Sequence, residues 1–382
     1  MPADAPHLVV DVSGHGLGHL GQVAPVLQAL RRQLPALRVT LRTAQPAPLV
    51  ARQLGLDAAV APPAAEAPIP MRGPLTVDAA GMAQGFAALH ADWPAAVTRE
   101  RQALARLAPD AVLADVPYTS LPAAAGLGVP ATALCSFNWL EAYAAYAGQR
   151  PEAGRIQGQI HAAYEAADRF LQPRPHTAMQ GLTNTRSIAP VARVGTPRSR
   201  QLRERLGVGP EAALVLVTWG GMGGAVFSAL PRCPGVVWLQ PDAPGGRPDV
   251  RDAAGTGLAH TDLIASVDAV VTKSGYATLA EALAAGTRVC MVSRPAWPED
   301  AGLRRWLAEC GTSAILEEGE ARPGRLAEAV VALLSRPRGE PVTPAGCEEA
   351  AAALRSDLGP AGSALPRQAR SRPSSDAEDP CA

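Results

Sequence analysis

The sequence has 382 residues, more than one ordinary hydrophobic core needs, so we expect two domains of roughly 150 to 200 residues each. Apolar residues make up 47% and charged residues 18%, a balance that excludes disorder as the global state. Lys plus Arg and Asp plus Glu both number 35, so the net charge is +0 and no basic field exists that would favour nucleic acid as a partner.

Cysteine usage and the first residues predict a cytoplasmic protein. The six cysteines form no CxxC pair, and a chain of this size does not need disulfides for stability. Residues 1–7 lack the basic start of a secretory signal. The longest nearly uncharged stretch, 111–140, is interrupted by Asp115 and by several Pro and Gly residues, so we expect no transmembrane segment. A peripheral position at the inner face of the membrane is the alternative.

The first half of the chain alternates predicted strands and helices. A β-branched run over 8–12 ends at Ser13-Gly14, and an apolar helical pattern follows from Leu20 to Leu34. The remaining predicted strands of this half lie at 38–43, 58–60, 111–114 and 131–137. The remaining helical patterns lie at 49–54, 79–107 and 138–170. This rhythm predicts a parallel sheet and a first Rossmann-like domain over residues 1–172.

The second half repeats the pattern after an irregular segment, 173–209, which we expect to cross between the domains. A second Rossmann-like domain is predicted over 210–338, with strands at 213–218, 236–240, 269–272 and 288–292. Within it, a helix over 277–285 ends at Gly286. Residues 339–382 predict one short Ala-rich helix and a frayed tail. The fold class is therefore α/β, with two doubly wound Rossmann-like domains.

A glycine-rich loop, GHGLGHLG at 14–21, connects the first predicted strand to the first helix. Three of its glycines match GxGxxG, a motif that alone indicates a dinucleotide: Gly16, Gly18 and Gly21. NAD would also require an acidic residue near the end of the second strand, and residues 12–56 contain none. An NADP-linked oxidoreductase, in which Arg42 receives the 2′-phosphate, remains an alternative.

Two histidines of this loop, His15 and His19, lie at the carboxyl end of a strand, where open α/β sheets bind ligands. A dinucleotide loop requires no imidazole, so we interpret them as proton-transfer groups, with His19 the first candidate. Their alternative role is to cap the helix or bond the loop backbone. Asp115 ends the fourth predicted strand and would reach the same crevice, where it could fix the tautomer of a histidine. Alternatively, Asp115 caps the helix near Leu121.

The second domain contains a predicted phosphate site. Lys273 ends a strand, and Ser274 and Gly275 lead into a helix whose free amides and dipole favour phosphate oxygens. This unit predicts a diphosphate ligand, with Glu281 in reach of a ribose diol. The alternatives are a solvated lysine and a glutamate favoured only by the helix dipole.

A second glycine cluster, TWGGMGG at 218–224, contains Gly220 and Gly221, which would let the backbone approach a ligand. The cluster lacks the GK[ST] of a P-loop, so it gives no support to ATP hydrolysis. The cysteines and histidines show no metal-ligand spacing, and we expect no metal.

Three segments together resemble a glycosyltransferase of the GT-B fold: VSGHGLGHLGQVAPVL, DAVLADVPYTSLPAAAGLGVP and VVTKSGYATLAEALAAGTRVCMVSR. The resemblance covers about residues 7–335. It is nearest to glycosyltransferase family 28 and to the glycosyltransferase-like N-terminal half of plant L-arabinokinase. The GHGxGH loop, SFNW at 136–139 and TKSGY at 272–276 are most similar to the latter. Nothing after Leu334 resembles its kinase half, so no kinase activity is expected.

The resemblance implies two domains that face each other across a cleft, with an acceptor held by the first and a nucleotide sugar by the second. His19 then matches a histidine near the reacting centre, and Glu281 a glutamate that contacts the donor ribose. Glu299 and Asp300 fall where related enzymes contact the donor sugar, although Pro298-Glu299-Asp300 departs from their usual Asp-Gln pair. The other residues placed on the donor side are Gly220, Gly221, Lys273, Ser274, Gly275 and Tyr276. The residues placed on the acceptor side are Gly16, Gly18 and Asn138.

These features predict inverting, metal-independent transfer of a hexosyl or N-acetylhexosaminyl group from a nucleoside-diphosphate sugar to an acceptor hydroxyl. His19 or His15, with Asp115, would remove the hydroxyl proton, while Lys273 and the helix start at Ser274 stabilise the leaving diphosphate. The co-substrate expected first is a UDP-sugar, with no further cofactor. A non-catalytic protein that binds a nucleotide sugar is the alternative, and the acceptor and oligomeric state stay open.

Overall fold

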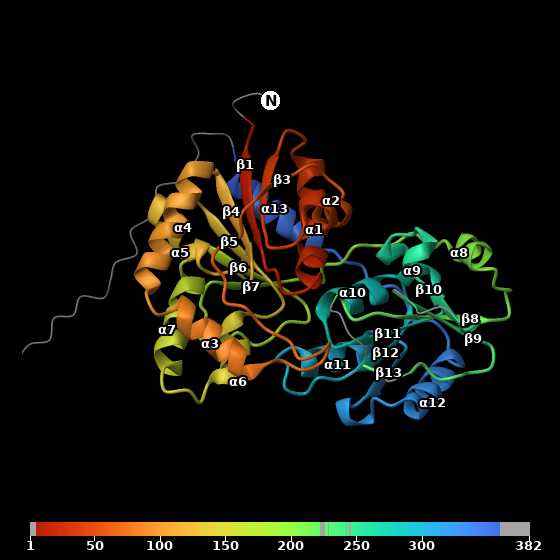
Figure 1. The fold of residues 1–382 in the computed structure, drawn as a ribbon. Coiled ribbons are helices and arrows are strands. Elements are labelled where there is room, and N and C mark those ends of the chain that lie inside the picture. Colours follow the sequence, from red (N-terminus) through yellow and green to blue (C-terminus); the bar gives the residue numbers. More distant parts are fainter. Residues whose placement is uncertain (1–4, 222–225, 228, 242, 244–245, 360–382) are drawn as a thin grey trace, which may run out of the picture.

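The computed structural model describes residues 5–221, 226–227, 229–241, 243 and 246–359, and Figure 1 shows two α/β domains side by side. The first is built on a seven-stranded sheet of order β3-β2-β1-β4-β5-β6-β7. The second is built on a six-stranded sheet of order β10-β9-β8-β11-β12-β13. Every strand pair in both sheets is parallel. The predicted α/β class with two doubly wound sheets is therefore confirmed.

The first sheet carries its helices on both faces, so its central strands are apolar on both sides, and every residue of β1 is buried. Its strands are β1 (His7–Val12), β2 (Arg38–Arg42), β3 (Ala59–Ala61), β4 (Ala111–Asp115), β5 (Ala131–Leu134), β6 (Arg169–Pro173) and β7 (Thr185–Ile188). The helices are α1 (Gly18–Gln33), α2 (Ala47–Leu54), α3 (Ala79–Leu89), α4 (Trp93–Leu107), α5 (Ser120–Leu127), α6 (Trp139–Ala147) and α7 (Ala153–Glu165).

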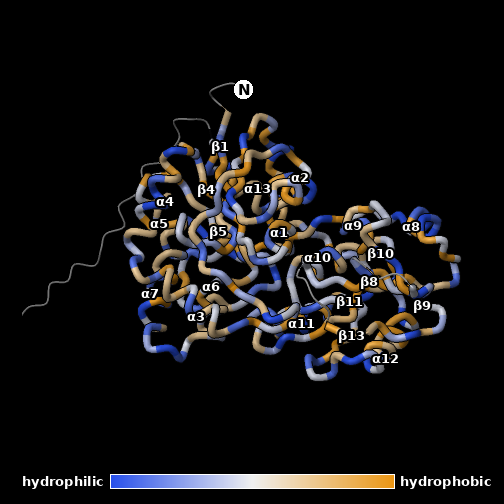
Figure 2. The backbone as a smooth tube through the Cα atoms, in the orientation of Figure 1, coloured by the Kyte–Doolittle hydropathy of each residue, from blue (hydrophilic) through white to orange (hydrophobic). Residues whose placement is uncertain are grey.

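The second sheet is organised in the same way around β8 and β11, which are hydrogen-bonded neighbours. Its strands are β8 (Ala213–Val217), β9 (Val236–Gln240), β10 (Val250–Asp252), β11 (Ala269–Lys273), β12 (Arg288–Val292) and β13 (Ser313–Leu316). The helices are α8 (Ser199–Leu206), α9 (His260–Ser266), α10 (Tyr276–Ala284), α11 (Asp300–Cys310) and α12 (Pro323–Leu334), with short 3₁₀ turns at Ala254–Thr256 and Glu318–Glu320. The outermost helix, α8, is largely hydrophilic (Figure 2).

The structure corrects two of the long helical predictions. The segment 79–107 forms two helices, because Asp92 caps α4 by accepting a hydrogen bond from the backbone N–H of Ala95. The segment 138–170 forms α6, α7 and the start of β6, a strand that we did not predict. The irregular segment 173–209 contains the end of β6, β7 and α8. Strands β10 and β13 were also missed.

The end of the chain is not simply a frayed tail. Helix α13 (Gly346–Asp357) lies beside α1 of the first domain, far from the α12 helix that precedes it in the sequence (Figure 1). Cys347, Ala350 and Leu354 are buried in the same apolar cluster as Leu27 and Leu30 of α1. The chain therefore returns to the first domain, and the alanines predicted as a short helix complete its core. Residues 360–382 lie outside the described part.

Leu354→Ala should lower the free energy of unfolding by about 2–5 kcal/mol, since it removes a fully buried side chain and leaves a cavity between α13 and α1. Urea unfolding, followed by circular dichroism, measures the change. The matched control is Val331→Ala on α12, where the side chain is 53% exposed and the expected loss is under about 0.5 kcal/mol. Equal losses in both variants would mean that α13 contributes little to the core.

None of the helices in the described ranges combines the length and the apolar character that a membrane crossing requires.

Candidate active site

A pocket between the two domains is lined by residues of both. It lies beyond the carboxyl ends of β1 and β11, where parallel α/β sheets bind ligands. The first domain contributes His15, Gly16, Gly18, His19, Gln22 and Phe137. The second contributes Gly220, Thr272, Lys273, Gly275, Tyr276, Ala277, Thr278, Arg294, Trp297 and Glu299. The two predicted sites, on the first loop and before α10, thus face the same space.

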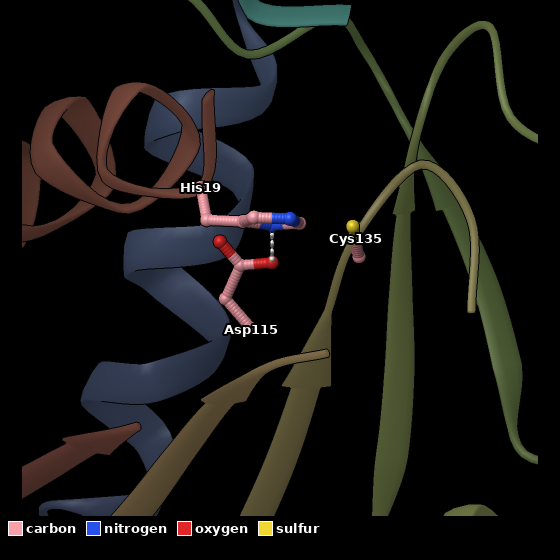
Figure 3. Close-up of side chains that lie close together, drawn as sticks. All are labelled: His19, Asp115 and Cys135. Carbon is pink, nitrogen blue, oxygen red and sulfur yellow. Dashed lines mark hydrogen bonds and ion pairs between the residues drawn. The ribbon is translucent and has the colours of Figure 1, made fainter. Parts of the chain in front are cut away.

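His19 lines this pocket on the side of the first domain and forms a buried pair with Asp115, which lies outside the lining. Strands β1 and β4 are parallel neighbours with Val12 opposite Asp115, so the loop after β1 passes close to the end of β4. The Nδ1 atom of His19 lies 3.1 Å from Oδ1 of Asp115 (Figure 3). The Asp115 alternative, a cap on α5, is not observed: the helix has no side-chain cap.

The environment makes His19 a stronger base than an ordinary imidazole. Burial disfavours the charged ring, but the charge and hydrogen bond of Asp115, helped by Glu66 and Glu299, raise the pKa of His19. A hydrogen bond from Nδ1–H to the carboxylate leaves Nε2 as the proton acceptor. The pair can therefore take a proton from a ligand in the pocket.

A thiol lies beside this pair. Cys135, at the end of β5, faces His19 and Asp115 in Figure 3, and the three ligand atoms lie within 4.8 Å of one another. Gln22 places its side-chain amide 3.8 Å from the sulfur. His, Asp and Cys are ligand types that Zn²⁺ accepts. Sequence spacing could not reveal this trio, because the fold brings together the first turn of α1, the end of β4 and the residue after β5. The absence of a metal stays a prediction.

His15 is placed differently from His19. Its ring stacks at 6.2 Å on Trp297 of the second domain and meets Trp139 edge-on at 5.9 Å. Burial, with the nearby charges of His19, Lys273 and Arg294, lowers the pKa of His15 to about 3. His15 is therefore neutral at ordinary pH and a weaker base than His19; that His19 is the first candidate stays a prediction.

The opposite wall carries two buried cations. Lys273 ends β11, and Gly275 lies directly before the first turn of α10. Burial and the nearby Arg294 lower the pKa of Lys273 well below its usual range. Arg294 follows β12, the parallel neighbour of β11; its guanidinium lies 4.6 Å from the centre of the Trp297 ring and donates to the backbone carbonyl of Ser274. Buried positive charge before a helix N-terminus favours an anionic ligand.

Arg294 was missed by the sequence analysis. It lies two residues after the predicted strand 288–292, and a search just beyond strand ends, which identified Asp115, could have found it.

The two predicted donor-sugar residues differ in position. Glu299 lines the pocket and accepts hydrogen bonds from Oγ of Ser136 (2.6 Å) and Nε1 of Trp297 (2.9 Å). Asp300 does not line it; its carboxylate accepts from Oγ of Ser293 (2.8 Å) and the backbone N–H of Arg294 (2.6 Å). Asp300 therefore holds the loop that carries Arg294.

Three other predicted residues lie outside the pocket lining. Asn138 is fully buried and caps α6 by accepting from the backbone N–H of Glu141 (2.8 Å), so its acceptor-side assignment is corrected. Ser274 is also buried, and its Oγ accepts from Nε of Arg294 at 3.3 Å. Glu281 accepts from Nη2 of Arg193 (2.6 Å), an ion pair beside Gly21 of α1 that sequence reasoning missed.

Tyr276 fixes the interdomain segment rather than a ligand. Its hydroxyl donates to the carbonyl of Arg174 (3.1 Å) and accepts from the backbone N–H of Val191 (2.9 Å). The residue also lines the pocket at the start of α10.

Comparisons with known sequences and structures identify the fold. No model of a protein family matches the sequence. A curated relative from Nocardia farcinica (strain IFM 10152), UDP-N-acetylglucosamine–N-acetylmuramyl-(pentapeptide) pyrophosphoryl-undecaprenol N-acetylglucosamine transferase, is 29% identical over 355 residues, 86% of this chain and 87% of the relative. The solved glycotransferase of kitacinnamycin is 18% identical, with a TM-score of 0.57 over 92% of this chain and 95% of its own. This chain has the GT-B fold.

The predicted resemblance to family 28 and to GT-B glycosyltransferases is therefore confirmed, whereas the resemblance to L-arabinokinase stays a prediction. The GT-B fold alone does not fix the reaction. A Listeria monocytogenes protein assigned as a UDP-N-acetylglucosamine 2-epimerase is 14% identical, with a TM-score of 0.56 over 93% of this chain and 96% of its own. The reaction must be argued from the side chains of the pocket.

In this GT-B chain the glycines of the first loop allow the two domains to pack closely against each other. A Cβ atom on Gly21 would lie 3.1 Å from Cβ of Ala277 on α10. From the other side, Gly220 accepts a hydrogen bond from the backbone N–H of Leu17 at 3.2 Å. Gly221 has a φ of 79°, and a Cβ there would lie 2.4 Å from Cγ of Leu17. Residues 222–225 of the second cluster lie outside the described part.

The NADP alternative is wrong because Arg42, the residue expected to receive the 2′-phosphate, is buried and already paired. Arg42 is 2% exposed, and its guanidinium donates to both carboxylate oxygens of Asp11 (2.6 and 2.9 Å) and to Glu100 (2.9 Å). A cation that is already enclosed by two carboxylates cannot receive a 2′-phosphate without leaving them buried and unpaired.

Proposed function

We propose that this GT-B chain is a glycosyltransferase that moves a sugar from a nucleoside-diphosphate sugar to an acceptor hydroxyl. The observation that carries the proposal is one pocket with a carboxylate-held imidazole, His19, on one domain and the cations Lys273 and Arg294 on the other. The name of the Nocardia relative contains UDP-N-acetylglucosamine, which supports a UDP-sugar and makes the N-acetylhexosaminyl type the first to test.

The reaction follows from the placement of charge. Nε2 of His19 takes the proton of the acceptor hydroxyl, and the oxygen attacks the anomeric carbon through an oxocarbenium-like state. The bond from that carbon to the diphosphate breaks, and its electron pair leaves with the phosphate oxygen. Lys273, Arg294 and the first turn of α10 stabilise this charge, a task that would otherwise fall to a metal ion. Attack and departure on opposite walls favour inversion.

The donor enters only if the domains separate. The interdomain pocket encloses about 70 Å³, far less than a nucleotide sugar needs. Two hydrogen bonds cross the gap beside it: Ser136 to Glu299 (2.6 Å), and the backbone of Leu17 to Gly220 (3.2 Å). We therefore infer that donor binding opens this contact and that the closed form excludes water during transfer.

A ligand screen tests the proposal directly. UDP, TDP, GDP and their sugars are added to the purified protein, and the melting temperature is followed, because a ligand that binds only the folded form raises it. Product analysis with an acceptor library then distinguishes transfer from epimerisation of the donor. Failure of every nucleotide to bind would end the proposal. Nucleotide binding without any product would favour the non-catalytic alternative. Cell fractionation separates a cytoplasmic location from a peripheral one at the inner membrane face.

Asp115→Asn should shift the pH dependence of transfer. The base must be neutral, so kcat/KM falls as the pH drops through the pKa of His19, which Asp115 raises. Without the carboxylate this pKa falls, and the acidic limb should move to lower pH. The maximal rate should also fall, about 10²–10⁴-fold, because the ring loses its fixed tautomer. An acidic limb that stays in place would assign it to another group. Asp110→Asn, outside the pocket, is the control.

A further inference from the structure

A second cavity of about 490 Å³ lies in the first domain next to the interdomain pocket. It is lined by the loop over 63–71, the glycine loop over 13–16 and Ala44, and it is open to solvent on one side. His15 and Gly16 line both cavities, so the two spaces adjoin at the glycine loop. The cavity is within the size range of pockets that hold small organic molecules.

The outer wall of this cavity is fixed by hydrogen bonds at three points. Glu66 accepts from Nε1 of Trp139 (2.8 Å) and from the backbone N–H of Gly14 (3.3 Å). Oγ of Thr119 donates to the carbonyl of Ala65 (2.7 Å), and the backbone N–H of Asp78 donates to the carbonyl of Pro70 (2.8 Å). A wall held in this way forms the cavity before any ligand binds.

Close packing of α3 adds to this fixation. A Cβ atom on Gly85 would lie 2.7 Å from Cδ of Pro68, and one on Gly81 would lie 2.7 Å from Cγ of Pro70. The two glycines therefore let the proline-rich loop lie directly on the helix.

The charges of the two cavities differ in sign. Lys273 and Arg294 belong to the interdomain pocket. Among the described residues that line the second cavity there is no lysine or arginine, and the one residue of charged type is Glu66. Arg72, next to this lining, is exposed and bound to Asp78 at 2.8 Å. A phosphate in this cavity would lose hydration and gain no cation; the group that it would face is the carboxyl of Glu66, whose pKa is raised by burial.

Apart from Ser13 and His15, the side chains of the remaining lining are apolar. Ala64, Ala67 and Ile69 present buried side chains, with prolines between them. The carboxylate of Glu66 offers about four acceptor positions, more than its contacts with Ser13, Trp139 and Gly14 use, so it can also accept from a hydroxyl of a ligand.

Resting on the function proposed above, we propose that this cavity binds the acceptor, and that the acceptor is an apolar alcohol without a phosphate. The reactive hydroxyl would reach the interdomain pocket past His15, the residue that both cavities share. The Nocardia relative is named for a pyrophosphoryl-undecaprenol acceptor, so this chain would differ from it in acceptor class.

Two matched probes test the class of ligand: 1-naphthylmethanol and 1-naphthylmethyl phosphate, which differ only in the phosphate. Equilibrium dialysis with the full chain measures both affinities. We expect the alcohol to bind at least about tenfold more tightly, because the phosphate must be desolvated beside Glu66. Equal or tighter binding of the phosphate, or no binding of the alcohol up to its solubility limit, would overturn the proposal.

Variants of the wall locate the probe. Ile69→Arg places a cation in the cavity and should weaken binding of the alcohol at least about tenfold while strengthening binding of the phosphate. Ala67→Leu adds apolar volume and should weaken both without a change of charge. The control is Val60→Arg, where the side chain is 44% exposed. Unchanged alcohol binding in both cavity variants would place the probe elsewhere and overturn the proposal.

UDP binding is measured for the unmodified chain and for each variant. It shows whether the variant is folded, and it separates the proposed glycosyltransferase function from the proposal about the acceptor cavity. Alcohol binding without UDP binding would contradict the proposed function but leave the ligand class of the cavity intact. UDP binding without alcohol binding would overturn the acceptor proposal alone.

Discussion

Replacing His19 by alanine is expected to lower kcat for sugar transfer by about 10²–10⁴-fold, the usual contribution of a general base. His19 combines a free Nε2, a raised pKa and a position in the pocket, and the described part of the chain shows no second carboxylate-held histidine there. The affinity for UDP should change little, because Lys273 and Arg294 are on the opposite wall. Steady-state kinetics with isothermal titration of UDP measures both quantities.

Two variants make the His19 result specific. His161→Ala removes an imidazole outside the pocket, which bonds the carbonyl of Gly181 at 2.9 Å, and should leave kcat unchanged. His15→Ala should weaken activity less than His19→Ala, because its pKa of about 3 makes it a poor base. If His15→Ala instead abolished transfer and His19→Ala did not, the roles of the two residues would be exchanged.

Lys273→Met is expected to weaken donor binding and to slow the transfer step, because both involve the diphosphate. The loss of a buried cation should weaken donor binding by about tenfold to a hundredfold. It should lower kcat by a further 10²–10³-fold or so, because charge on the leaving group peaks as the bond breaks. Methionine keeps the length and apolar stem of the side chain, so the variant tests the charge. Titration of UDP-sugar and single-turnover kinetics separate the two effects.

The controls for this variant use the same sheet. Lys273→Arg restores the charge and should recover part of the activity. Arg288→Met removes a cation at the amino end of β12, where Nε donates to the carbonyl of Arg336 (2.7 Å), and should change neither step. An unchanged donor affinity in Lys273→Met would show that the diphosphate lies elsewhere.

Most of the strands that sequence reasoning found have β-branched or apolar runs and lie in the interior of a sheet; the exceptions are β3, an edge strand that was found, and β6, an interior strand that was missed. The strands that it missed include β7, β10 and β13, which are all edge strands. An edge strand has one partner and more exposure, so it tolerates polar residues such as those of Thr185–Ile188 and loses the apolar signal. Helix α13 was underestimated because its partner, α1, is more than 300 residues earlier.

The candidate site was predictable where a motif and a strand end coincide, as for His19, Asp115 and Lys273. It was not predictable where a side chain is buried in the fold and forms its hydrogen bonds with other protein groups instead of a ligand. Glu281 and Asn138 have the right residue type and spacing, but one is bound by Arg193 and the other caps α6. The acceptor-side cavity could not be predicted at all, since the proline-rich loop shows no periodicity and acquires its role through Glu66 and Trp139.

The single lysine of the sequence offers a chemical handle on the donor pocket. Lys273 is the only lysine among the 382 residues, and in the empty pocket its lowered pKa leaves more of the amine uncharged, the form that attacks electrophiles. A bound diphosphate would favour the charged form on which the proposed transfer depends. An amine-directed reagent can therefore modify one side chain, besides the α-amino group, and bound UDP should shield it. Peptide mapping by mass spectrometry would give the fraction of Lys273 that is modified with and without UDP. The difference would report how much of the pocket is occupied, even before an acceptor is identified.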